Sequence, residues 1–168
     1  MKYLALIFSI LTFNTLIAQD NLVINEPVEL TYKVVGSDSL KAYVFFPDDT
    51  SNKEEHPSIV IFHGGGWAMG EPSWGFRHAK KYAKLGLVSI VAQYRLSDEK
   101  NITPIEAMAD SRDLILWMRE NPKELKISKD SIAAYGWSAG AHLAASSAVF
   151  PGYNPDSSLS SIPNALIL

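Results

Sequence analysis

Short apolar runs that alternate with helical patterns constrain the fold of this chain more than any other feature of its sequence. The runs are rich in β-branched residues and have the length of strands buried on both faces; they cover 58–62, 87–92 and 131–135, and another begins at 164. Helical patterns lie between and after them, over 76–85, 104–120 and 139–148. Strands that alternate with helices form βαβ units, so the sequence predicts an α/β fold: a mostly parallel sheet with helices on both faces.

The segment before these runs predicts an antiparallel hairpin. Residues 28–35 and 40–46 have the composition of strands, and turn residues at 36–39 separate them. A polar and charged loop over 47–57 follows. A hairpin that leads into a parallel sheet is a common form of mixed sheet.

The first residues predict a secretory signal peptide over 1–18. Lys2 supplies a positive charge, an apolar run covers 3–17, and the small residue Ala18 precedes a polar stretch. The apolar run is shorter than the ~20 residues that a membrane-spanning helix needs, so no stable membrane anchor is expected. We therefore expect a secreted or periplasmic protein in which 19–168 form the N-terminal part of one domain.

Composition excludes several classes of partner. The net charge is −3 and acidic and basic residues are interspersed, which argues against a nucleic-acid-binding protein. The chain has no cysteine, so no disulfide framework is possible. A small neutral or acidic substrate is the partner that this composition favours, and no metal or cofactor is implied.

A G-x-S-x-G motif at 136–140 predicts a nucleophile elbow centred on Ser138. The motif follows the strand at 131–135 and precedes a helix, which is the context that this turn requires. The serine is then held in a strained conformation at the tip, and its hydroxyl projects from the sheet. Gly136 and Gly140 are required because the strand and the helix approach closely there.

A second motif, H-G-G-G-W at 63–67, follows the strand at 58–62. Acyl transfer needs backbone N–H groups that point at one oxygen with no side chain in the way, and consecutive glycines after a strand supply them. Esterases combine this type of loop with G-x-S-x-G. Together the two motifs predict a serine hydrolase.

With both motifs in place, the chain resembles the esterase and lipase branch of the α/β-hydrolases, which includes the hormone-sensitive-lipase-like enzymes. It is most similar to bacterial carboxylesterases grouped with feruloyl and acetylxylan esterases. The similarity extends over 58–150. Besides the two motifs, it rests on the segment 93–97, on Asp110 and on Trp117.

This resemblance implies the α/β-hydrolase fold and a carboxylesterase that acts through an acyl-enzyme on a small-molecule or polysaccharide ester. Ser138 would be the catalytic nucleophile, and His63 is similar to the family histidine that braces the glycine loop without transferring a proton. The oxyanion hole would comprise the N–H groups of Gly65, Gly66 and Ala139. The remaining supporting residues would be Gly64, Trp67, Gly136 and Gly140.

Two other readings stay open. Trp137 precedes the serine, as in prolyl-oligopeptidase-like peptidases, although those usually have an aromatic residue where this chain has Ala139. A non-catalytic relic that keeps the fold is the other alternative. Trp67 and Trp74 either line the acyl pocket or cover the core.

Several polar residues are expected to be structural. His142 lies on the helix behind Ser138 and would not reach back to its hydroxyl. Asp110 and Asp113 precede the serine, whereas the triad order in this fold is Ser, then Asp or Glu, then His. His56 is expected in the charged loop.

The triad acid and histidine are expected to be absent from the sequence. No histidine follows His142, and Asp156 is the only acid after Ser138. The last apolar run stops inside an apparent strand, and single domains of this class have about 250 residues. We therefore interpret the chain as a C-terminally truncated hydrolase that is inactive as given.

Overall fold

A single mixed sheet forms the centre of the molecule in the computed structural model, which describes residues 26–48, 55–97, 102–150 and 158–168. The strand order is β1-β2-β4-β3-β5-β6. The strands are β1 (Val28–Val35), β2 (Asp38–Phe45), β3 (His56–Phe62), β4 (Val88–Ala92), β5 (Ile127–Gly136) and β6 (Ala165–Ile167). β1 pairs antiparallel with β2, and β2 with β4, whereas β4, β3, β5 and β6 run parallel. The predicted mixed α/β sheet with its N-terminal hairpin is confirmed.

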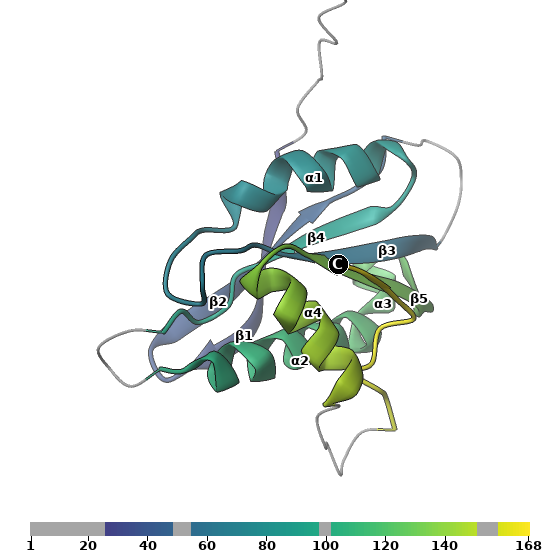
Figure 1. The fold of residues 1–168 in the computed structure, drawn as a ribbon. Coiled ribbons are helices and arrows are strands. Elements are labelled where there is room, and N and C mark those ends of the chain that lie inside the picture. The colour runs from purple at the N-terminus through teal and green to yellow at the C-terminus, as the bar shows by residue number, and fades with distance from the viewer. Residues whose placement is uncertain (1–25, 49–54, 98–101, 151–157) are drawn as a thin grey trace, which may run out of the picture.

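Helices cover both faces of this sheet (Figure 1). On one face α1 (Ser73–Lys84) lies over β3 and β4. On the other face lie α2 (Pro104–Glu120) and α4 (Ala139–Val149), with the short α3 (Pro122–Leu125) after α2. None of the described helices is long and apolar enough to cross a membrane. The signal peptide predicted over 1–18 and Asp156 lie outside the described residues.

Two hydrophobic clusters, one on each face, explain why the strands have continuous apolar runs. Successive side chains of a strand point to opposite faces. Ile59 and Ile61 of β3 therefore pack under α1, whereas Val60 and Phe62 pack under α2 and α4. Leu143 of α4 is fully buried on the second face. A strand between two helical layers has no polar side, as the sequence pattern predicted.

The helix predicted over 104–120 has these bounds in the structure because its start is capped locally. The Thr103 hydroxyl accepts from the N–H of Ile105 at 3.2 Å, and the Glu106 carboxylate accepts from the N–H of Thr103 at 2.7 Å. This capping box satisfies N–H groups at the helix start that would otherwise lack a partner.

Other boundaries differ from the prediction. The hairpin turn is Gly36–Ser37, and β2 already begins at Asp38, because Gly36 adopts φ 61° and permits a two-residue turn. α1 begins at Ser73 and not at 76, directly after Pro72. His56 is also not in a loop: it is the buried first residue of β3.

Candidate active site

The register of the parallel strands brings the two predicted motifs to the same edge of the sheet. Phe62, the last residue of β3, pairs with Gly136, the last residue of β5. The glycine loop that follows β3 and the serine motif that follows β5 therefore leave the sheet at the same level. Ligands of open α/β sheets bind outside this carboxyl edge of the strands.

The serine motif forms a sharp turn between β5 and α4. Ser138 is exposed and has φ 54° and ψ −124°, a conformation that costs an L-residue free energy, and α4 begins at the next residue. A Cβ atom at Gly136 would lie 2.2 Å from the Gly140 carbonyl oxygen. A Cβ atom at Gly140 would lie 2.0 Å from the Phe62 carbonyl oxygen. Only glycine fits at these two positions, so β3, β5 and α4 can meet there.

The glycine loop depends on backbone conformations that favour glycine. Gly65 has φ 128°, and a Cβ atom there would lie 1.9 Å from the Met69 carbonyl oxygen. Gly66 and Trp67 both have φ 62°. The Gly65 carbonyl accepts from the N–H groups of Ala68 and Met69, which closes the loop into a tight turn.

Three backbone N–H groups at this edge remain free to bind a ligand. Those of Gly65, Gly66 and Ala139 form no hydrogen bond with any other described residue. Ala139 is the first residue of α4, and the positive end of the helix dipole favours negative charge there. These are the residues that the family resemblance implies for an oxyanion hole.

His63 lies inside the base of the glycine loop. Its Nδ1 donates to the Gly64 carbonyl at 2.6 Å, and a Cβ atom at Gly70 would lie 2.7 Å from that nitrogen. The hydroxyl of Tyr94 donates to the His63 carbonyl at 2.7 Å, and the two rings stack at 4.5 Å. Burial lowers the pKa of His63, which keeps the ring neutral. His63 therefore occupies the space that the loop encloses.

The two ends of the loop contact the serine motif and the first turn of α4. A Cβ atom at Gly64 would lie 2.9 Å from the Trp137 indole, so the loop backbone rests on that ring. At the other end, the Trp67 ring meets the His142 ring edge-on, at 5.1 Å and 85°. The Trp67 carbonyl accepts from the N–H of Ser97. The loop is thus held between the residue before Ser138 and a residue one turn into α4.

None of the four histidines of the sequence forms a hydrogen bond with the Ser138 hydroxyl. His142 is exposed and contacts Trp67, as its helix position suggested. His78 contacts the Tyr135 hydroxyl at 3.3 Å and stacks on Trp137. His56 faces the Gly86 carbonyl at 3.3 Å, at the opposite edge of the sheet.

Asp110 is structural, as predicted, and its partners are now defined. It is fully buried and accepts from Arg95 Nη2 at 2.8 Å and from Lys33 Nζ at 2.6 Å. Tyr94 was not predicted as a contact of His63. A tyrosine two residues after a buried strand was the available signal.

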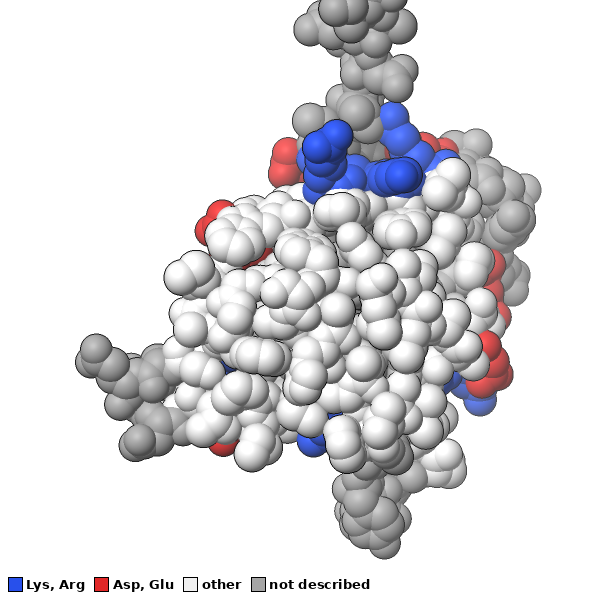
Figure 2. All heavy atoms as spheres, in the orientation of Figure 1, with Lys and Arg blue, Asp and Glu red and all other residues white. Residues whose placement is uncertain are grey.

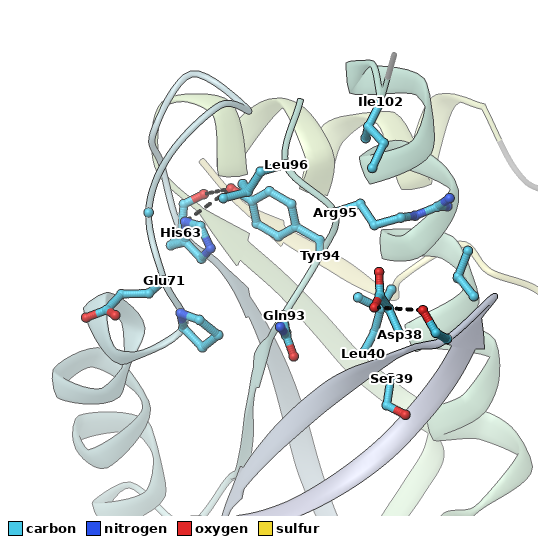
Figure 3. A pocket seen from close by; sticks show the side chains of 14 residues that line it. Asp38, Ser39, Leu40, His63, Glu71, Gln93, Tyr94, Arg95, Leu96 and Ile102 are labelled. Atoms are coloured by element: carbon cyan, nitrogen blue, oxygen red, sulfur yellow. Dashed lines mark hydrogen bonds between the residues drawn. The ribbon is translucent and has the colours of Figure 1, made fainter. Parts of the chain in front are cut away.

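A cavity of about 710 Å³ opens beside the loop, on the side of His63 and Tyr94 (Figure 3). Its walls include Glu71 and the segments 37–40 and 93–96, but Ser138 is not among the residues that line it. Within the described residues, no group of three or more His, Cys, Asp or Glu could hold a metal ion.

Comparison with known proteins shows that this chain is similar to esterases of the α/β-hydrolase fold. The structure of a thermophilic esterase, Est2 with propionate bound, from the planctomycete Thermogutta terrifontis superposes with a TM-score of 0.78 and 32% identity, over 87% of this chain and 55% of that one. An arylesterase of Saccharolobus solfataricus is 32% identical over 54% of this chain and 29% of its own length. The non-reducing polyketide synthase atr1 of Stereocaulon alpinum is 26% identical over 71% of this chain, which is 5% of the synthase.

The BD-FAE family model, which describes esterase-like α/β-hydrolases, matches residues 44–158. The chain belongs to the BD-FAE family. The matched segment contains both the glycine loop and the serine motif. The chain spans about half of the length of the esterase structure and smaller fractions of the two other relatives.

Proposed function

We propose that the protein hydrolyses carboxylic esters, with Ser138 Oγ as nucleophile and the N–H groups of Gly65, Gly66 and Ala139 as donors to the oxyanion. One observation carries the proposal: the exposed, strained Ser138 lies between a strand and a helix, beside a glycine loop with free N–H groups. The similarity to esterases supports the reaction class.

In the proposed acylation step, Ser138 Oγ attacks the carbonyl carbon of the ester while a general base takes its proton. The carbonyl oxygen becomes an oxyanion that the free N–H groups stabilise. Collapse of the intermediate breaks the bond to the alcohol, which leaves with the proton. Water then attacks the acyl-enzyme in the same way and releases the acid.

No histidine among the described residues is positioned to remove the proton from the Ser138 hydroxyl. Since no histidine forms a hydrogen bond with the Ser138 hydroxyl, we expect the 168-residue chain to acylate slowly on its own. Imidazole in solution can act as the general base in place of a histidine side chain. Its effect on Ser138 therefore separates an intact nucleophile and oxyanion loop from a non-catalytic relic.

Paraoxon is a suitable probe, because it transfers a diethylphosphoryl group to a serine oxygen with loss of p-nitrophenolate, and the Thermogutta esterase has been captured phosphorylated by paraoxon. We expect intact-protein mass spectrometry to show one adduct, mapped to Ser138, whose rate of formation increases with imidazole. Ser138→Ala should form none. Equal labelling of the two proteins, or no adduct on folded protein at any imidazole concentration, would refute the proposal.

The role of the glycine loop has its own control. Gly65→Ala places a methyl group against the Met69 carbonyl and displaces the loop, so we expect the adduct to form at least about tenfold more slowly. Gly36→Ala lies in the hairpin turn, in open space, and should leave the rate unchanged.

Acyl preference and localisation follow as further proposals. Related Est2 structures contain propionate or butyrate, which supports p-nitrophenyl esters of short acids as first substrates. A prolyl anilide that is cleaved faster than these esters would favour the peptidase reading. We also propose secretion to the periplasm or medium, and sequencing of the mature N-terminus should then begin at Gln19.

A further inference from the structure

One solvent-facing side of α1 and of its C-cap residue carries an unusual combination of side chains, which we call the α1 stripe: Trp74, Arg77, Lys81 and Lys84 of the helix and Leu85 at the cap. These positions recur at intervals of three and four residues, so they share one face of the helix. All five residues are exposed, with Trp74 at 48% and Leu85 at 67%. In Figure 2 Lys and Arg side chains gather over α1, at the top of the view.

Among the described residues, no carboxylate pairs with Arg77, Lys81 or Lys84, the cations of the α1 stripe. The first turn of α1 has no acidic residue either. The whole chain has a net charge of −3, so the stripe has the opposite sign to the rest of the molecule. Acidic and basic residues are interspersed along the sequence, and the helix brings these three cations to one face.

Cations flanked by an exposed indole and an exposed aliphatic side chain fit one kind of partner best. At a membrane surface Lys and Arg meet anionic headgroups, Trp occupies the headgroup level, and Leu reaches the acyl boundary. A soluble polyanion would also attract the cations, but it would offer nothing to Leu85. We propose that the α1 stripe docks reversibly on lipid bilayers that carry anionic headgroups.

The position of the α1 stripe in the fold agrees with this docking mode. Lys84 lies at the end of α1, four residues before β4 begins at Val88. Val28, where β1 begins, lies at the same sheet edge, because Val28 pairs with Val44 and Val44 with Ile90. Ser138 lies at the opposite edge, where Trp74 at the start of α1 contacts His63 with ring centroids 6.0 Å apart. Docking centred on Lys81, Lys84 and Leu85 would therefore leave Ser138 accessible to water.

Co-sedimentation with vesicles tests the proposal independently of any enzymatic activity. We expect the protein to bind vesicles that contain phosphatidylglycerol, to bind phosphatidylcholine vesicles much more weakly, and to lose binding as salt is raised. Lys81→Gln/Lys84→Gln should reduce the partition coefficient at least about tenfold, because each cation contributes to headgroup attraction. Glutamine keeps a high helix propensity, and circular dichroism verifies the fold.

The matched control is Lys123→Gln/Lys129→Gln, which removes the same charge from two exposed lysines elsewhere and should leave binding unchanged. Leu85→Ser should weaken vesicle binding without altering the affinity for dextran sulfate, a soluble polyanion. Equal losses in the two lysine pairs would overturn the proposal. So would equal binding to neutral vesicles, or binding to dextran sulfate alone.

Discussion

Two residues at the site, Ser138 and His63, occupy states that an isolated peptide would avoid. Ser138 has a positive φ, which costs an L-residue about 1–3 kcal/mol and persists only because the surrounding elements enforce it. His63 is 1% exposed, with one ring nitrogen bonded to Gly64 and the ring stacked on Tyr94. The fold therefore maintains both residues, and for Ser138 it does so at a cost in stability.

The buried state of His63 predicts a dependence of stability on pH. Burial lowers its pKa from the ordinary value of 6.5, so the unfolded chain takes up a proton more readily than the folded chain. The neutral ring contributes to the free energy of unfolding, and this contribution is fully present above about pH 6.5. It is lost as the pH falls through the lower pKa of His63 in the folded state. Urea unfolding should show this decrease, and His63→Gln should show a shallower one.

A matched variant checks this assignment. His142 is an exposed histidine, so His142→Gln should retain the pH dependence of the unmodified protein. If the free energy of unfolding falls with pH equally in His63→Gln and His142→Gln, a group other than His63 causes the pH dependence.

At the scale of elements, the site exists because three of them approach each other without side chains in between. The start of α4 touches the end of β3 at Gly140, and the end of β5 touches α4 at Gly136. Pairing of Phe62 with Gly136 fixes the level at which this happens. The turn that carries Ser138 is thus a consequence of how β3, β5 and α4 pack.

The Gly140→Ala variant measures this packing. Its new methyl group would lie 2.0 Å from the Phe62 carbonyl oxygen, so α4 must move, and we expect a loss of about 3 kcal/mol or more in the free energy of unfolding. Gly36→Ala has open space and only a positive φ to overcome, so it should cost about 1 kcal/mol. Denaturant titration distinguishes the two, and similar losses would contradict the close approach.

At the scale of the whole molecule, Asp110 links segments that are distant in the sequence. It lies on α2 and pairs with Lys33 of the hairpin and with Arg95, which follows β4. The neighbouring carboxylate raises the pKa of Arg95 further, and the hydrogen bonds of this pair hold the segment after β4 against α2. This cluster connects the antiparallel and parallel parts of the sheet.

We expect Asp110→Ala to lower the free energy of unfolding by about 3 kcal/mol, because it leaves cations without their buried partner. Asp113 provides the comparison. It also pairs with Lys33 at 2.6 Å, but its side chain is 45% exposed, so Asp113→Ala should cost less than about 1 kcal/mol. Comparable losses in urea unfolding would show that burial does not distinguish the two pairs.

The sequence by itself determined the features that depend on neighbouring residues. The runs at 58–62 and 131–135 predicted buried strands because their composition is continuous along the chain. The bounds of α2 were predictable since Pro104 favours the start of a helix and Pro122 ends the pattern. The serine and glycine motifs were recognised for the same reason: each is a short continuous segment whose glycines have a local conformational meaning.

Only the tertiary structure decided which of these segments meet. The strand order, the contact of Gly64 with Trp137 and the contact of Trp67 with His142 join residues that are far apart in the sequence. The same holds for the pairing of Asp110 with Lys33 and for the stacking of His63 on Tyr94. The physical reason is that periodicity and turn chemistry act over a few residues, whereas these contacts depend on strand register and on how the helices pack across the sheet.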